Sequence, residues 1–192
     1  SNENSSFRQT QSESLAELSN VTAVSAADFD LDGDLDLIII DFEGKVSLWA
    51  NYREFQFYDV TARSALPPDD FFCEEAIAID LDRDVDLDIV LRGRKSIGYL
   101  KNMRHGSLRW EQIDSIGESK NITNLKIVDF DSNASWDLLF CREGEIVYLP
   151  SKISIPGSIR WSDTVNETGL TGNEMYLFDY DNDGFQDIAL KD

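Results

Sequence analysis

Histidine and cysteine are scarce in this chain. Its 192 residues include one histidine, His105, and two cysteines, Cys73 and Cys141. One histidine and two cysteines are too few for a histidine-based catalytic triad or a zinc centre to be expected. The two cysteines lie at unrelated places in the sequence and do not form a disulfide framework. We therefore expect no catalytic residues. A carboxylate-pair glycosidase remains open because acids are plentiful, and Glu74 and Glu75 are the acids that the patterns below explain least.

Basic side chains are also few. The chain has 17 Lys and Arg against 37 Asp and Glu, which gives a formal net charge of −20. We expect no nucleic-acid partner, because nucleic-acid binding requires a basic surface. No apolar run approaches membrane-spanning length and no signal peptide is visible, so we expect no direct membrane insertion.

One stretch, from residue 91 to 109, runs against the acidic trend. It has six basic residues and no acidic ones: Arg92, Arg94, Lys95, Lys101, Arg104 and Arg109. This cluster could bind an anionic glycan or protein, or it could be an outer-strand face that balances acidic neighbours. We favour the second interpretation.

What the chain does have is an acidic loop that occurs four times. The loops span 28–36, 80–88, 129–137 and 179–187, and we call them acidic loops 1 to 4. Short carboxylates at alternate positions of a tight loop can converge on a hard cation such as calcium, together with a backbone carbonyl from position 7. The predicted metal ligands, at positions 1, 3, 5, 7 and 9, are Asp28, Asp30, Asp32, Asp34 and Asp36; Asp80, Asp82, Asp84, Asp86 and Asp88; Asp129, Asp131, Asn133, Ser135 and Asp137; and Asp179, Asp181, Asp183, Phe185 and Asp187.

The four loops are not equal. A glycine occupies position 6, where the chain must turn sharply, in loops 1 and 4 as Gly33 and Gly184. Loop 2 has Val85 there, and loop 3 has Ala134 as well as Asn133 in place of an aspartate. We expect loop 3 to hold its ion most weakly.

Two other interpretations of the loops are weaker. An EF-hand closes with a glutamate at position 12, but here that position is apolar: Ile39, Leu91, Phe140 or Leu190. A merely solvated acidic face would explain one loop, but not four in register with the same flanking pattern. Four bound divalent ions would add 8 positive charges and leave −12 of the formal −20.

The repeat extends beyond the loop. Each loop is followed by a short apolar run that predicts a buried strand. The first three then have a glycine-containing turn, at Gly44, Gly93 or Gly144, and a strand carrying Trp49, Tyr99 or Tyr148; the aromatic residues Phe7, Phe57, Trp110 and Trp161 stand before the successive loops. Four short antiparallel strands in about 50 residues is the size of a β-propeller blade.

These segments resemble a known family. AADFDLDGDLDLIII (26–40) and FDYDNDGFQDIAL (178–190) resemble the FG-GAP or VCBS repeats, the calcium-bearing blades of integrin-α-like propellers. FYDVTARSAL (57–66) and WSDTVNETGL (161–170) are similar to blade endings of proteins that carry this repeat beside an ASPIC/UnbV region. The resemblance covers nearly the whole chain and implies structural calcium in loops that join strands 1 and 2 of each blade. The Phe-Gly and Gly-Ala-Pro signatures of integrin blades are absent, so no direct integrin role is expected.

We therefore predict an all-β fold: a β-propeller segment over residues 1–192, with about four blades, three complete and one partial. Residues 1–6 are expected to be disordered, 7–10 to form the outer strand of a preceding blade, and 174–191 to supply only strands 1 and 2 of the last. Because propellers of the resembled family usually have more blades, we expect the chain to continue into a larger ring. A closed four-bladed ring is the alternative.

Three functions are compatible with this fold. The first is a noncatalytic, calcium-stabilised domain for protein interaction or cell adhesion. The second is a glycan-binding propeller that uses Trp136, at position 8 of loop 3, although leucines at that position in loops 1 and 2 favour a buried wedge. The third is an accessory domain of a larger secreted enzyme.

The calcium-type loops and the glycosylation sequons bear on the location of the chain. Millimolar calcium affinity is common in extracellular modules and favours an extracellular or periplasmic location. Five glycosylation sequons occur, at Asn4, Asn20, Asn121, Asn133 and Asn166. Repeat ancestry explains Asn20 and Asn121 as well as glycosylation does, and a glycan would be hard to accommodate at the predicted ligand Asn133.

Overall fold

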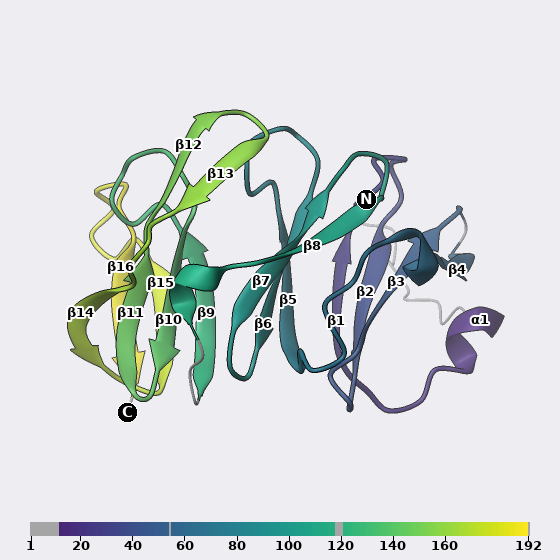
Figure 1. Ribbon diagram of the computed structural model, residues 1–192, viewed down its shortest axis with the longest axis horizontal. Helices are drawn as coiled ribbons and strands as arrows, with labels where there is room; N and C mark the ends of the chain where they lie inside the picture. The colour runs from purple at the N-terminus through teal and green to yellow at the C-terminus, as the bar shows by residue number, and fades with distance from the viewer. Residues whose placement is uncertain (1–11, 54, 118–120, 192) are drawn as a thin grey trace, which may run out of the picture.

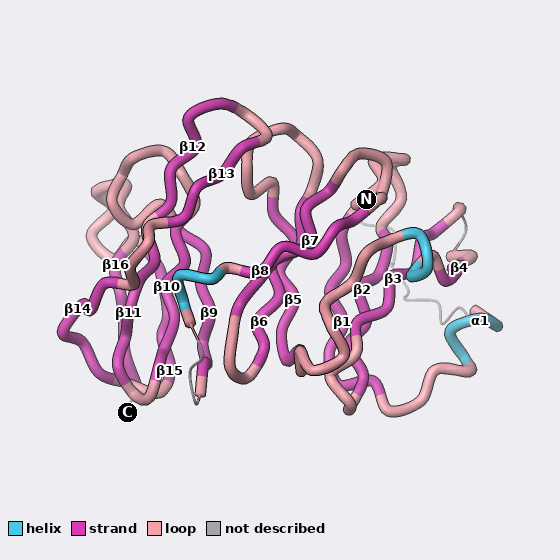
Figure 2. The backbone as a smooth tube through the Cα atoms, in the orientation of Figure 1, coloured by secondary structure: helices cyan, strands magenta, loops and turns pink. Residues whose placement is uncertain are grey.

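The computed structural model describes residues 12–53, 55–117 and 121–191, and β-strands dominate them (Figures 1 and 2). The predictions for Asn4, for Phe7 and for residues 1–10 lie outside these ranges. Three antiparallel sheets have four strands each. Sheet 1 contains β1 (Val21–Ala27), β2 (Asp36–Asp41), β3 (Val46–Asn51) and β4 (Phe57–Asp59); sheet 2 contains β5 (Cys73–Ile79), β6 (Asp88–Gly93), β7 (Ile97–Asn102) and β8 (Leu108–Gln112).

The third repeat departs from this pattern. Sheet 3 contains β9 (Ile122–Val128), β10 (Asp137–Arg142), β11 (Glu145–Leu149) and β14 (Asn166–Thr171). Between β11 and β14, the strands β12 (Ser151–Ile155) and β13 (Ser158–Trp161) form a separate hairpin. A last pair, β15 (Glu174–Phe178) and β16 (Asp187–Lys191), forms a two-stranded sheet.

Consecutive sheets pack face to face: β1 contacts β5, β6 contacts β9, and β9 contacts β15. Alternate side chains of each second strand serve two interfaces. In β6, Ile89 and Leu91 pack in the core between sheets 1 and 2, whereas Val90 packs in the core between sheets 2 and 3. In β10, Leu138 faces sheet 2 and Leu139 faces β15 and β16. Burial on both faces explains why these strands are continuously apolar.

The aromatic residues pack between strands and sheets, as their repetition indicates. Trp110 joins the core between sheets 1 and 2, and Trp161 and Tyr99 join the core between sheets 2 and 3. The equivalence of Trp110 with Phe57 is wrong, however. Phe57 pairs with Asn51 and Leu108 pairs with Asn102, so Leu108 is the true counterpart and Trp110 lies two residues further along.

The predicted turns are mostly confirmed. Gly44 and Gly144 lie in the turns after β2 and β10 with φ of 74° and 87°, values that suit glycine. Gly93 instead ends β6 and pairs with Cys73. An added Cβ at Gly93 would lie 3.0 Å from the Phe71 ring, so close packing explains this glycine.

A short helix, α1 (Glu13–Ala16), lies beside the outer face of sheet 1, where Leu15 packs near Trp49 and Phe57. Within the described ranges, no helix has the length and apolar character needed to cross a membrane.

Candidate metal-binding loops

Each acidic loop joins the first two strands of its sheet and brings carboxylates together. Ligand atoms of three aspartates lie within 4.8 Å of one another in every loop. These groups are Asp28, Asp30 and Asp32; Asp80, Asp82 and Asp84; Asp129, Asp131 and Asp137; and Asp179, Asp181 and Asp187. The predicted ligands at positions 1 and 3 therefore converge in all four loops. Position 5 joins them in loops 1 and 2, and position 9 joins them in loops 3 and 4.

The first aspartate organises the backbone of its loop. In loop 1, Asp28 accepts hydrogen bonds from the backbone N–H groups of Asp32 and Gly33, at 3.1 and 3.0 Å. The equivalent pairs of bonds occur in loops 2, 3 and 4. Because four different sequences make the same bonds, the loops share one backbone shape.

That shape requires a positive φ at two positions. Position 6 has φ of 94° at Gly33 and 90° at Gly184, but also 83° at Val85 and 66° at Ala134. Loops 2 and 3 thus keep the turn without its glycine, under strain that is greatest for the β-branched Val85. Position 4 also has a positive φ in every loop, at Leu31, Arg83, Ser132 and Asn182. Of these four residues only Asn182 is of a type that favours a positive φ, so the sequence gives no common signal for it.

The aspartate at position 9 anchors the loop to the sheet. Asp36 is fully buried and accepts hydrogen bonds from the N–H groups of Phe29, at position 2, and of Asn51, the last residue of β3, at 3.0 and 2.8 Å. Asp88 and Asp137 accept the equivalent pairs. Burial raises the pKa of Asp36 to about 6 and that of Asp88 to about 7.

The clustered oxygens fit a hard divalent cation. Calcium takes six to eight oxygen ligands, and each loop offers several carboxylates at one point. Burial and the nearby Asp32 carboxylate raise the pKa of Asp30. A bound cation would offset this repulsion. In loop 3, Asn133 directs Oδ1 to the N–H of Ser135 and Nδ2 to the carbonyl of Ser151, at 2.7 and 2.8 Å. Asn133 Nδ2, the atom to which a glycan would be attached, is therefore already hydrogen-bonded.

The following repeat covers loops 1 and 2. Asn102, at the end of β7, donates to the carbonyl of Phe29 in loop 1 at 2.7 Å, and Gly106 packs against Asp30. The tip of the β12–β13 hairpin lies over loop 2, where the N–H of Gly157 donates to the carbonyl of Asp82 at 2.9 Å. The contacts that cover each of these loops thus come from residues about 75 positions later in the sequence.

Trp136 also contacts the preceding loop. Its indole Nε1 donates to the carbonyl of Asp80, 3.0 Å away, and its ring packs against the core between sheets 2 and 3. Trp136 is therefore a partly buried packing residue, as the leucines at the equivalent position indicate, and not a free aromatic side chain at the edge of its loop. One edge still lines a cleft of about 550 Å³ beside loops 3 and 4, together with Asp129 and Phe185.

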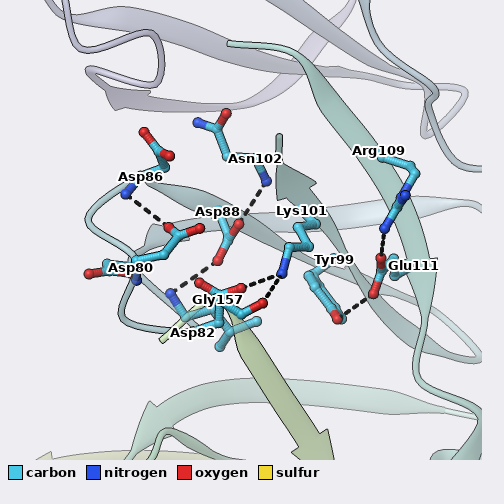
Figure 3. Close-up of polar contacts among 12 residues, drawn as sticks. Asp80, Asp82, Asp86, Asp88, Tyr99, Lys101, Asn102, Arg109, Glu111 and Gly157 are labelled. Atoms are coloured by element: carbon cyan, nitrogen blue, oxygen red, sulfur yellow. Dashed lines mark hydrogen bonds and ion pairs between the residues drawn. The ribbon is translucent and has the colours of Figure 1, made fainter. Parts of the chain in front are cut away.

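A lysine side chain from β7 contacts loop 2 (Figure 3). Lys101, on β7, directs its ammonium group to Asp82 Oδ2 at 2.5 Å and to the carbonyl of Gly157 at 2.6 Å. The Asp82 side chain is only 2% exposed. Its other oxygen, Oδ1, is buried and has no hydrogen-bond partner among the described residues. Sequence reasoning placed Lys101 in the basic cluster and missed this contact.

The basic cluster is balanced by acidic neighbours. Arg92 bonds Glu75 and Glu74, both at 2.8 Å, and Arg94 bonds Glu74 at 2.9 Å. Arg109 bonds Glu111 at 2.5 Å. These pairs account for Glu74 and Glu75 and favour the balancing interpretation of the cluster. Both cysteines are free and buried.

The loop geometry agrees with a repeat family that part of the chain matches. The chain carries an FG-GAP-like repeat. The model of this repeat matches residues 28–91, from the first aspartate of loop 1 to the end of the apolar run after loop 2. Such repeats often bind calcium, are typical of extracellular regions and are generally noncatalytic. No curated protein matches the chain.

Proposed function

We propose that this chain is a calcium-stabilised, noncatalytic β-propeller segment that supports protein interaction or cell adhesion outside the cell or in a periplasm. The observation that carries the proposal is the carboxylate cluster that recurs at the same point of all four repeats. Calcium would hold the loops that bind it against their sheets, so that the surface formed by the loops keeps one shape. The loops then serve structure rather than catalysis.

Thermal melting with and without calcium tests this proposal. A ligand that binds only the folded state stabilises it by about 2.7 kcal/mol at 100 times its Kd, so calcium should raise the melting temperature by roughly 5–10 °C over EDTA. Replacing Asp28 and Asp30 with Asn should reduce the rise. Asp69→Asn, outside the loops, is the matched control. A melt that EDTA leaves unchanged would contradict calcium binding.

We also propose that a further sheet of the same kind packs against β15 and β16. The residue immediately before each acidic loop faces the following sheet: Ala27, Ile79 and Val128 are all packed in the corresponding cores. The fourth such residue, Phe178, is 42% exposed, and Tyr176 on the same face is 53% exposed. A continuing ring would cover both.

A glycan-binding function is the second candidate, favoured by the cleft beside Trp136 and Phe185. Phe185 is 62% exposed and could stack on a sugar ring. Binding to a glycan array that Phe185→Ala abolishes would support it, and the absence of any bound glycan would reject it.

A further inference from the structure

We propose that the ammonium group of Lys101 is the resident cation of acidic loop 2 and takes the place of a divalent metal ion there. Among the described residues, no Lys or Arg forms an ion pair with an aspartate of loops 1, 3 or 4. Loop 2 would then be held in its folded shape by an ion pair that needs no calcium.

The position of Lys101 in its repeat is the first support. The residue after it, Asn102, donates its N–H to Asp88 at 2.7 Å, as Asn51 does to Asp36 and Ser151 does to Asp137. The residues equivalent to Lys101 are therefore Ala50 and Pro150. Neither carries a charge, so the built-in cation is specific to loop 2 among these three repeats.

The contacts of the ammonium group are the second support. It lies 2.5 Å from the carboxylate of Asp82, which is position 3 of the loop and part of the convergent cluster with Asp80 and Asp84. A calcium ion needs its ligand oxygens at about 2.3–2.6 Å. An ion bound through Asp82 would share that carboxylate with the ammonium group, and two cations this close repel strongly where water is excluded.

The hairpin holds this arrangement in place (Figure 3). Gly157 accepts from Lys101 at 2.6 Å through its carbonyl and donates to the carbonyl of Asp82 at 2.9 Å through its N–H. Gly157 also lies against Asp84, because an added Cβ would be 3.7 Å from that side chain. The β12–β13 hairpin thus covers the loop and fixes the lysine at the same time. The ammonium group contacts only Oδ2 of Asp82, and Oδ1 has no hydrogen-bond partner among the described residues, so we expect Asp82 to act as a metal ligand once the charge of Lys101 is removed.

Counting bound calcium ions tests the inference. Lys101→Met keeps the aliphatic stem and removes the charge, and we expect this variant to bind one more calcium ion per chain than the wild type in equilibrium dialysis. Adding Asp82→Asn to it should restore the wild-type number. Lys152→Met removes an exposed lysine of the same hairpin and should leave the number unchanged. Equal numbers in the wild type and Lys101→Met would overturn the proposal.

Stability provides a second readout. In EDTA, Lys101→Met leaves the buried Asp82 charge unpaired and should melt roughly 10 °C below the wild type. Calcium should recover most of that loss and so stabilise the variant more than it stabilises the wild type. A variant that folds only with calcium supports the proposal equally, provided that Lys101→Met with Asp82→Asn folds without it. A loss that calcium does not recover would count against the inference.

Calcium binding by the other loops serves only as a reference in these experiments. If the wild type binds no calcium, the proposed function fails. The comparison of the wild type with Lys101→Met still decides what Lys101 does.

Discussion

At the scale of single residues, Val85 is the most strained position of the acidic loops. Its φ of 83° lies in the left-handed region, which costs an L-residue about 1–2 kcal/mol. Its side chain gains little in return, because Val85 is 73% exposed. The strain persists because the Asp80 carboxylate accepts hydrogen bonds from the N–H groups of Asp84 and Val85, and these bonds fix the backbone shape of the loop.

Val85→Gly should therefore stabilise the protein. Relief of the strain exceeds the extra entropy that glycine gives the unfolded chain, and we expect a net gain of about 0.5–1 kcal/mol in urea unfolding. The reverse change in loop 1, Gly33→Val, is the matched control, because an added Cβ there meets no atom within 4 Å. It should lose about 1–2 kcal/mol through backbone strain alone. A less stable Val85→Gly would show that the valine contributes packing.

At the scale of elements, Arg92 connects two sheets. Arg92 lies on β6, and its side chain is 11% exposed. It forms ion pairs with Glu74 and Glu75 of the neighbouring strand β5, and it donates a hydrogen bond to the carbonyl of Ile122 in β9 at 2.9 Å. Losing all three bonds leaves the partly buried Glu75 carboxylate unpaired and leaves Glu74 paired only with Arg94.

We expect Arg92→Met to lower the free energy of unfolding by about 2 kcal/mol. Arg94→Met is the control, because Arg94 is 57% exposed and bonds only Glu74 among the described carboxylates. Exposed pairs contribute less than about 1 kcal/mol. Urea unfolding of both variants checks the difference. Equal losses would mean that the connection to Ile122 contributes nothing.

The elements that the sequence predicts best are those with a local signal. The aspartates of the loops and the apolar runs after them predict the loops and second strands, because a carboxylate cluster and a doubly buried strand each require those residue types. The β12–β13 hairpin is different. Trp161 suggests the ordinary fourth strand, and its pairing with Ser151 does match that of Phe57 with Asn51. The longer connection before it, residues 152–160, lets the strand separate from sheet 3.

Contacts between repeats are the part that local patterns do not predict. Lys101 and Gly157 lie 56 residues apart, and either alone is an ordinary surface residue type. Only the packing of sheet 3 against sheet 2 brings the hairpin to loop 2. The same holds for Arg92, whose partners come from two different sheets.

At the scale of the whole molecule, the burial of the strands from solvent differs between the central sheets and the last pair of strands. The central strands β6 and β10 are buried at nearly every residue, whereas β16 is nowhere fully buried. Amide hydrogen exchange should therefore be faster in β15 and β16 than in β6 and β10.

The same measurement on a longer protein tests the proposed continuation of the ring. If a further sheet covers Tyr176 and Phe178, the amides of β15 and β16 should exchange roughly tenfold more slowly there than in this chain, or slower still. Unchanged exchange would indicate that the outer face of β15 and β16 stays open to solvent.

The cover that each sheet places on the loop before it has a consequence for synthesis on the ribosome. Loop 1 can collect a cation as soon as β1 and β2 form, but Asn102 and Gly106 close over it only after about 60 more residues have been made. Loop 2 likewise waits for Gly157, and its lysine has no second acceptor among the described residues until then. Loops 1 and 2 are thus each completed by the repeat that follows, so their cover forms in one direction, from the N-terminal repeat onward, and a newly made loop stays open to solvent until the next repeat is in place.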